Sequence, residues 1–278
     1  MTPTAEELGG DGLDQGTVMR CGELTVVGRI RSASNATFLC EARLGEAQLH
    51  CVYKPVAGEA PLWDFPDGTL AGREVGAYLI SAALGWDVVP HTILREGPAG
   101  PGMVQRWVEQ PEDGDTESAT GPDLVDLLPA GRIPPGYLPI LQAYDYAGDE
   151  VTLVHADDAR LRRMAVFDVL INNADRKGGH ILAGVDGRVY GVDHGVSLHT
   201  DDKLRTVLWG WAGKPVDDEA LEAVARLGDT LRGELGRQLA AHITRREIAA
   251  LRARIVALLD HPVMPMPDRH RPIPWPAF

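Results

Sequence analysis

The chain has 278 residues, of which 44% are hydrophobic and 24% are charged, the proportions of an ordinary globular protein with a full core. Its 27 basic and 40 acidic residues give a net charge of −13. This charge argues against a nucleic-acid-binding protein and against stable association with an anionic membrane, because both partners require basic surfaces. A lipid substrate is disfavoured for the same reason.

The first residues and the cysteines indicate a cytoplasmic protein. Residues 1–18 are acidic and glycine-rich, without the basic start and apolar core of a signal peptide, so we expect a mobile tail there. Cys21, Cys40 and Cys51 match no zinc pattern, and one would remain if two formed a disulfide. A reducing compartment therefore suits the chain best. We find no run of about 18 apolar residues that would span a membrane.

Residues 19–109 predict a sheet with one helix. Short segments rich in β-branched and apolar residues predict strands at 23–30, 37–44, 48–54, 88–95 and 102–109. Residues 70–84 predict a helix that begins after Thr69 and ends at Gly85. The chain therefore opens with an antiparallel sheet that a helix interrupts.

A small polar loop joins the first two predicted strands. It contains Ser32, Ser34 and Asn35, whose hydroxyls and backbone N–H groups can bind anionic oxygens. The loop is therefore a candidate phosphate-covering loop. It lacks the glycines of a G-x-G-x-x-G loop, and an ordinary hairpin connection explains it equally well.

The second half of the chain follows an acidic segment. Residues 110–122 contain four acidic residues and no basic one, which predicts a mobile linker. We expect residues 123–261 to be mainly helical, with one short helix and loops up to residue 147. Helical periodicity or capping signals then appear at 157–172, 217–227 and 244–259. Residues 262–278 are rich in proline and predict an extended tail, which packs over this half or, alternatively, binds a partner.

Candidate catalytic and cation-binding residues follow the helix predicted at 157–172. Asp175 lies on a polar loop, and a hairpin pattern comes next, in which Asp186-Gly187 predicts a two-residue type I′ turn. That turn places His180 directly opposite Asp193, with both side chains on one face. Asp175, His180 and Asp193 would then converge as a site for a cation and for proton transfer.

Two motifs around these residues resemble the catalytic and metal-binding loops of phosphatidylinositol 3/4-kinases and related bacterial kinase-like proteins. The motifs are DRKGGHI at residues 175–181 and VDHG at residues 192–195. The family has roughly D-R-H-x-x-N-I and I-D-x-G. The resemblance implies an α+β fold of the bilobal protein-kinase-like class. Such a fold has an N-terminal five-stranded antiparallel sheet plus one helix, here residues 19–109, and a mainly helical C-lobe, here residues 123–261.

The resemblance also implies roles for single residues. Asp175 matches the Asp that accepts the proton of the substrate hydroxyl, and Asp193 matches the Asp that binds magnesium on the nucleotide phosphates. His180 stands where the family has a metal-binding Asn, which is a departure from its pattern. Another departure is Lys177, which stands where the family often has His. An imidazole ligand would tilt metal preference towards transition metals and weaken binding as pH falls through about 6.5.

Kinase folds also use a strand lysine on the nucleotide phosphates and a helix glutamate that orients it. Lys54, at the end of the third predicted strand, and Glu74, in the predicted helix, stand in the right order for these roles. Lys54 is thus a candidate for both catalysis and nucleotide binding. Asp168, within the helix at 157–172, is expected to hold the Asp175 loop by hydrogen bonds.

The resemblance therefore implies an ATP-dependent phosphotransferase that moves the γ-phosphoryl group to a hydroxyl of a protein or small molecule, with Mg²⁺ or Mn²⁺. Two alternatives stay open. One is a catalytically inactive kinase-like module that binds nucleotide or a partner. The other is a metal-dependent phosphoesterase, for which the candidate ligands are Asp175, His180, Asp193, His194 and His199.

Overall fold

The computed structural model describes residues 14–30, 35–111 and 123–278. Its N-terminal part is a five-stranded antiparallel sheet with the order β1-β2-β3-β5-β4. The strands are β1 (Glu23–Arg29), β2 (Phe38–Leu44), β3 (Ala47–Pro55), β4 (Thr92–Gly97) and β5 (Gly100–Arg106). All five predicted strands are present, although β4 begins later and β5 ends earlier than predicted.

Helix α2 (Leu70–Leu84) connects β3 to β4 through a loop, as predicted. The side chain of Thr69 accepts a hydrogen bond from the backbone N–H of Gly72, and Gly85 ends the helix with a φ of 69°. Ala77 and Ile80 are fully buried in the larger of two apolar cores, which the second half of the chain also forms. The helix therefore lies between the sheet and the second lobe.

A short helix, α1 (Gln15–Cys21), corrects the prediction of a mobile tail through residue 18. Asp14 caps it by accepting a hydrogen bond of 2.7 Å from the backbone N–H of Gly16. Val18 and Met19 are buried in the smaller core, together with sheet residues that include Cys40, Ala42, Cys51, Tyr53 and Val104. A helix of 7 residues is too short for its periodicity to be read from the sequence. The rest of the predicted tail, residues 1–13, lies outside the described residues.

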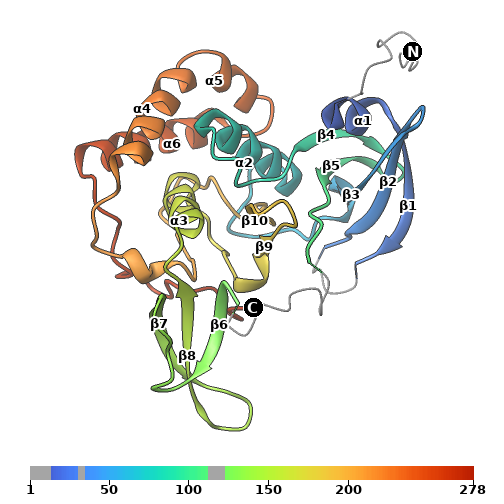
Figure 1. Ribbon diagram of the computed structural model, residues 1–278. Coiled ribbons are helices and arrows are strands. Elements are labelled where there is room, and N and C mark those ends of the chain that lie inside the picture. Colours follow the sequence, from blue (N-terminus) through green and yellow to red (C-terminus); the bar gives the residue numbers. More distant parts are fainter. Residues whose placement is uncertain (1–13, 31–34, 112–122) are drawn as a thin grey trace.

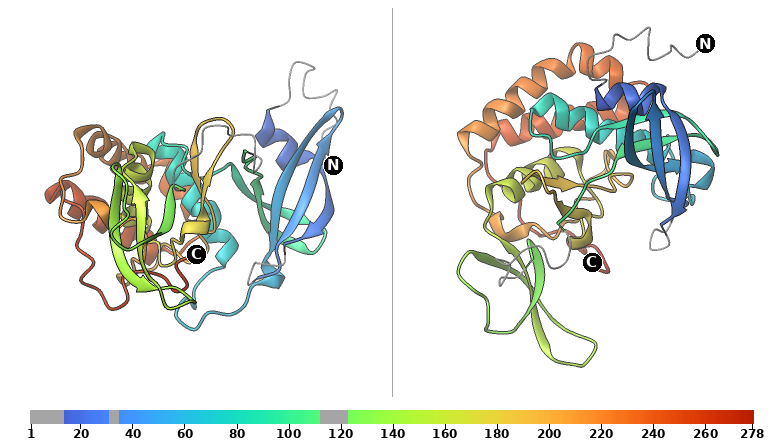
Figure 2. Two further views of the ribbon diagram at one scale, coloured as in Figure 1. Left: turned by 60° about the horizontal axis from the view of Figure 1, so that its bottom comes forward. Right: turned by 45° about the vertical axis from the view of Figure 1, so that its right-hand side comes forward.

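The second lobe contains α3 (Ala159–Ile171), α4 (Asp218–Leu231), α5 (Glu234–Leu239) and α6 (Arg245–Asp260). Asp158 caps α3, and Thr244 and Glu247 form the capping box that the sequence predicts for α6. Figures 1 and 2 show these helices on one side of the molecule and the five-stranded sheet with α1 on the other. In the part of the chain that is described, no helix is both long and apolar enough to cross a membrane.

A three-stranded antiparallel sheet corrects the prediction of a short helix and loops up to residue 147. Its strands β6 (Val125–Pro129), β7 (Tyr137–Tyr144) and β8 (Glu150–Ala156) have the order β6-β8-β7 and extend away from the helices (Figure 1). The register shifts between Pro139 and Leu141, so alternation breaks within β7. The second lobe is therefore a mixture of helices and strands, and the description "mainly helical" is too simple.

The hairpin of β9 (Ile181–Ala183) and β10 (Val189–Gly191) pairs one residue out of the predicted register. Leu182 lies opposite Tyr190, whereas the prediction placed it opposite Gly191. The backbone N–H of Gly184 donates to the carbonyl of Arg188 at 2.9 Å, which closes a three-residue loop instead of a two-residue turn.

The side chain of Asp186 explains the longer loop. Its carboxylate accepts hydrogen bonds from the backbone N–H of Arg188 at 3.1 Å and from the hydroxyl of Tyr190 at 2.6 Å. A type I′ turn needs positive φ at both central residues, but Gly187 has a φ of 76° and Asp186 is not in that region. The register change places Val192 opposite His180, where the prediction placed Asp193.

A fully buried ion pair fixes α2 to α6. Arg73 Nη2 lies 2.5 Å from Glu247 Oε1, and the two residues are 1% and 3% exposed. Arg73 also donates to the backbone carbonyls of Ser197 at 2.7 Å and Asp67 at 2.9 Å. This pair holds α2 against the second lobe, and α2 also carries Glu74, the residue after Arg73.

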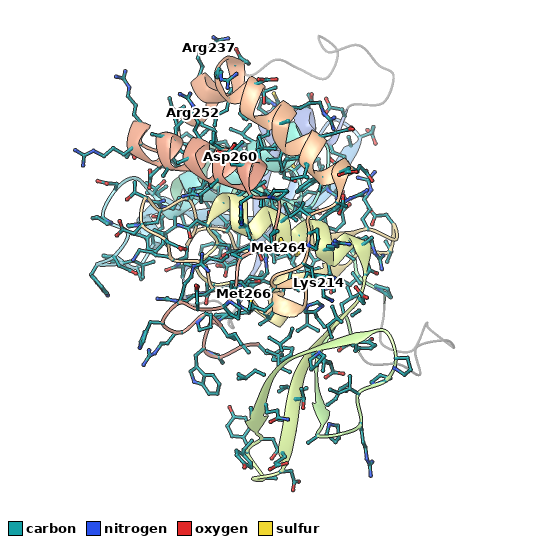
Figure 3. The ribbon with its side chains drawn as sticks, turned by 90° about the vertical axis from the view of Figure 1, so that its left-hand side faces the viewer. Lys214, Arg237, Arg252, Asp260, Met264 and Met266 are labelled. Atoms are coloured by element: carbon teal, nitrogen blue, oxygen red, sulfur yellow. The ribbon has the colours of Figure 1, made fainter. Side chains whose placement is uncertain are left out.

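The proline-rich segment packs over the second lobe, as predicted. The backbone N–H of Met264 donates to the carbonyl of Lys214 at 2.9 Å, and Figure 3 shows these residues close together with Met266. Met264 is buried in the larger core. The segment then continues beneath the helices towards β9 (Figure 1).

Candidate active site

The ammonium group of Lys54 joins the five-stranded sheet to the second lobe. Its Nζ lies 2.8 Å from Glu74 Oε1 and 2.7 Å from Asp193 Oδ1. The other carboxylate oxygen of Glu74 accepts a hydrogen bond of 2.8 Å from the backbone N–H of His194. The structure therefore brings together three residues that the sequence places far apart, and Glu74 ties Lys54 to the loop that carries Asp193.

The charges of Lys54, Glu74 and Asp193 shift the pKa values of their neighbours in this group. Burial alone would lower the pKa of Lys54, but the carboxylates of Glu74 and Asp193 raise it well above its usual range. The charge of Lys54 in turn holds the pKa of Asp193 far below that of an ordinary carboxyl. Lys54 is therefore protonated and Asp193 ionised at neutral pH.

Asp175 lies in the same cavity as this group. The cavity has a volume of about 260 Å³ and is lined by Lys54, Glu74, Asp175 and Asp193 among others. Burial raises the pKa of Asp175, the nearby Lys177 lowers it, and the charge of Asp193 raises it further. Lys177 Nζ lies 3.5 Å from Asp175 Oδ2. A carboxylate with a raised pKa is a better proton acceptor, which suits the role predicted for Asp175.

His180 and Asp193 face each other although they are not paired in the hairpin. His180 Nδ1 lies 3.0 Å from the backbone carbonyl oxygen of Asp175 and donates its proton there, which leaves a lone pair on Nε2. Nε2 lies 3.5 Å from Asp193 Oδ2. Asp193 has a φ of 61°, which turns its carboxylate out of the extended strand direction. The predicted contact is therefore present. It goes with the backbone conformation of Asp193 and not with pairing of His180 and Asp193 across the hairpin.

His180 Nε2 and the Asp193 carboxylate are the two groups here that could hold a divalent cation. Burial lowers the pKa of His180 to about 4, although the charge of Asp193 opposes the shift. At neutral pH two acceptors, the Nε2 lone pair and a carboxylate oxygen, thus face each other without a proton between them. A metal ion with nitrogen and oxygen ligands suits such a donor set.

The lowered pKa of His180 predicts a pH-dependent stability. Between pH 4 and about 6.5 the unfolded chain binds a proton that folded His180 does not, so the folded state loses stability as pH falls through this range. Urea unfolding should show the wild type losing about 2–3 kcal/mol more than His180→Asn between pH 7.5 and 4.5.

The matched control is His270→Asn, because His270 is an exposed histidine of the C-terminal segment. This variant should follow the wild type at every pH. Parallel pH profiles for His180→Asn and the wild type would show that His180 titrates normally. The shift also moves the expected loss of metal ligation from pH 6.5 down to about 4.

A second cavity, of about 320 Å³, opens on the other side of the Lys54–Asp193 pair. Its apolar walls come from both lobes and include Ile30, Val52, Val108, Leu182 and Val192. Arg106, Trp107, Val108 and Gln110, at and after the end of β5, also line it. The lining also includes polar residues, among them Thr37, Gln105 and Gln110. The apolar walls suit a flat purine base, and Lys54 would then face the phosphates.

Asp168 holds the loop that carries Asp175, as predicted. Asp168 Oδ1 accepts a hydrogen bond of 3.0 Å from Asn173 Nδ2, and Asn173 Oδ1 accepts one of 3.0 Å from the backbone N–H of Asp175. Arg176, which is fully buried, donates to both carboxylate oxygens of Asp168. Sequence reasoning gave Arg176 no role, although it stands inside the motif, because nothing local indicates that this arginine points into the core.

Comparison with known proteins places the chain in a family. No family model matches it. Protein Rv2133c of Mycobacterium tuberculosis strain H37Rv is 71% identical over 266 residues, which cover 95% of this chain and 96% of that protein. The chain belongs to the Rv2133c family. The resemblance to phosphatidylinositol 3/4-kinases therefore stays one of motifs.

Among solved structures, the Rv2133c-family chain is similar to CtkA, a Helicobacter pylori proinflammatory kinase. The match covers 86% of this chain and 97% of that chain, with a TM-score of 0.39 and 12% sequence identity. At this TM-score and identity, no argument about this chain rests on the match.

The remaining candidate residues of this Rv2133c-family chain lie elsewhere or serve other contacts. Ser32 and Ser34 lie outside the described residues. Asn35 lines the cavity of Asp175, and its Oδ1 accepts a hydrogen bond of 2.9 Å from the backbone N–H of Ala60. Asn35 is thus placed at the site, but its oxygen already has a partner.

Two histidines of the phosphoesterase alternative are engaged away from the cleft. His194 is buried, and its Nε2 accepts a hydrogen bond of 2.6 Å from Arg176. His199 Nδ1 accepts one of 2.9 Å from the backbone N–H of Asp201. Within residues 14–30, 35–111 and 123–278, no three His, Cys, Asp or Glu side chains form a metal-binding group. The geometry does not favour a two-metal centre.

Proposed function

We propose that the chain is an ATP-dependent phosphotransferase that moves the γ-phosphoryl group of ATP to a hydroxyl of a protein or small molecule. One observation carries the proposal. The Lys54–Asp193 pair stands where two cavities meet, one with apolar walls that suit a base and one that holds Asp175. This is the order in which base, phosphates and acceptor hydroxyl must lie for transfer along the cleft.

Each of these side chains of the cleft would have its own role in phosphoryl transfer. Lys54, oriented by Glu74, would offset negative charge on the phosphates, and Asp193 with His180 would hold one divalent ion, Mg²⁺ or Mn²⁺. Such an ion supplies further neutralisation of phosphate charge when bound. Asp175 would accept the proton of the acceptor hydroxyl as its oxygen bonds to the γ-phosphorus. The bond from that phosphorus to the oxygen bridging it to the β-phosphate breaks, and ADP leaves.

The proposal includes a cytoplasmic location, where ATP is available. Cys40 and Cys51 lie opposite each other in β2 and β3 and are both free thiols, as a reducing compartment favours. The acidic net charge of −13 favours a protein or small-molecule acceptor over an anionic lipid.

One observation favours the inactive module as a second candidate. Asp193 Oδ1, which would face a metal ion in an active enzyme, is held by Lys54 at 2.7 Å, and His180 replaces the Asn of the family pattern. Nucleotide would then bind without turnover.

Incubation with ATP labelled on the γ-phosphate, with Mg²⁺ or Mn²⁺, separates the candidates. The proposal predicts label on the protein itself, on proteins of an extract or on added small alcohols. Binding of ATP without any transfer supports the inactive module and contradicts the proposal. Hydrolysis of generic phosphate esters without ATP binding supports a phosphoesterase.

A further inference from the structure

The last residues of the chain contact the loop that carries Asp175. We call residues 272–278 the tail segment. The carbonyl of Pro272 accepts hydrogen bonds of 3.0 Å from the backbone N–H of Thr206 and from Trp209 Nε1. The carbonyl of Ala277 accepts one of 2.8 Å from the backbone N–H of Gly178. Figures 1 and 2 show the end of the chain beside the segment that enters β9.

The ring of Phe278 lies directly over Gly178. A Cβ atom added to Gly178 would overlap this ring and would lie 2.7 Å from its Cδ1. A Cβ atom added to the neighbouring Gly179 meets no described atom within 4 Å. The ring of Phe278 would therefore have to move to admit a side chain at position 178, whereas position 179 has open space.

Gly178 lies between Lys177 and His180, which both contact Asp175. Lys177, on one side, places its Nζ 3.5 Å from the Asp175 carboxylate. His180, on the other, donates from Nδ1 to the Asp175 carbonyl at 3.0 Å, and its backbone N–H donates to the Lys177 carbonyl at 3.2 Å. A shift of this turn would therefore move the groups that set the charge and the backbone of Asp175.

We infer that Ala277 and Phe278 position the active-site loop: they hold the Gly178 turn so that Lys177 and His180 stay against Asp175. The kinetic part of this inference rests on the proposed function. No contact described above joins the tail segment to Lys54, but Gly179 and His180 of the turn that it holds line the apolar cavity. Its loss should therefore lower turnover and weaken nucleotide binding to a smaller extent. Phe278 is 47% exposed, so its removal leaves the folded core intact.

The first test is independent of activity. Deletion of residues 277 and 278 removes the acceptor of the Gly178 N–H, so we expect amide hydrogen exchange at residues 178–181 to become at least about tenfold faster. Trp275→Ala is the matched control, because Trp275 is an aromatic residue of the same segment that is 85% exposed. Unchanged exchange in the deletion variant would overturn the inference, whether or not the chain proves to be a kinase.

The second test is kinetic. Phe278→Ala and Gly178→Ala should each lower kcat by about 10- to 100-fold and change KM for ATP by less than about twofold. Trp275→Ala should behave as the wild type. Because truncation of the Phe278 ring frees the space that the new Cβ needs, Gly178→Ala combined with Phe278→Ala should be no slower than Phe278→Ala alone.

Faster exchange with an unchanged kcat would mean that the segment only packs, and would overturn the positioning role. If the wild type neither binds nor turns over ATP, the proposed function fails. The exchange experiment then still decides whether the tail segment holds the Gly178 turn.

Discussion

Replacement of Asp175 by Asn is expected to slow phosphoryl transfer by about 10²- to 10⁴-fold while nucleotide affinity stays within about twofold. Asn has nearly the shape of Asp but cannot accept the proton of the acceptor hydroxyl. The apolar cavity and the Lys54–Asp193 pair do not depend on the Asp175 carboxylate. Transfer of labelled phosphate and calorimetric titration with ATP measure the two quantities separately.

The fold should survive this change, because the loop is held by other groups. The backbone N–H of Asp175 donates to Asn173, and its carbonyl accepts from His180. Asp260→Asn is the matched control, since Asp260 lies at the end of α6 on the face turned away from the five-stranded sheet (Figure 3). Transfer at the wild-type rate in Asp175→Asn would exclude Asp175 as the proton acceptor.

The largest loss of stability is expected for Arg73→Met, which should lower the free energy of unfolding by about 3–5 kcal/mol. The variant leaves Glu247 buried and without its cationic partner, at 3% exposure. It also removes the donors to the carbonyls of Ser197 and Asp67. Urea unfolding at neutral pH measures the change.

Two further variants serve as controls for that result. Arg237→Met removes an exposed ion pair with Glu234 on α5 and should cost less than about 1 kcal/mol. Arg73→Met combined with Glu247→Leu removes both buried charges, so it should recover part of the loss. If Arg73→Met is no worse than Arg237→Met, the buried pair does not fix α2 to the second lobe.

The centre of the site could be predicted because its residues stand at the ends of regular elements. Lys54 ends a strand with a clear β pattern, and Glu74 lies in a helix whose two caps are visible in the sequence. Asp193 follows a short strand within a recognisable motif. When the elements are right and their order is known, such residues meet without any further detail of packing.

The hairpin shows where local pattern fails. Asp186-Gly187 predicts a two-residue turn, but the Asp186 side chain bonds to Arg188 and Tyr190 and favours a three-residue loop. Because side chains alternate with a period of two, one residue of slip changes every pairing. The contact between His180 and Asp193 is nevertheless present, with Asp193 at a positive φ and outside the ladder.

Contacts between segments that lie far apart in the sequence could not be predicted from local sequence patterns. Gly178 looks like an ordinary turn glycine, and nothing near it indicates that Phe278 lies on it. Arg73 looks like an exposed helix residue until Glu247 is seen opposite it. Such pairs depend on how whole elements pack, which the local sequence pattern does not encode.

The central claim is that metal-bound ATP occupies the cleft at Lys54 and Asp193. Calorimetric titration of the wild type and Asp193→Asn with ATP, with and without Mg²⁺ or Mn²⁺, tests it most directly. Metal should strengthen binding to the wild type, and Asp193→Asn should lose this gain because its side chain no longer carries the charge that attracts the ion. No binding to the wild type at millimolar ATP, or an equal metal dependence in both proteins, would contradict it.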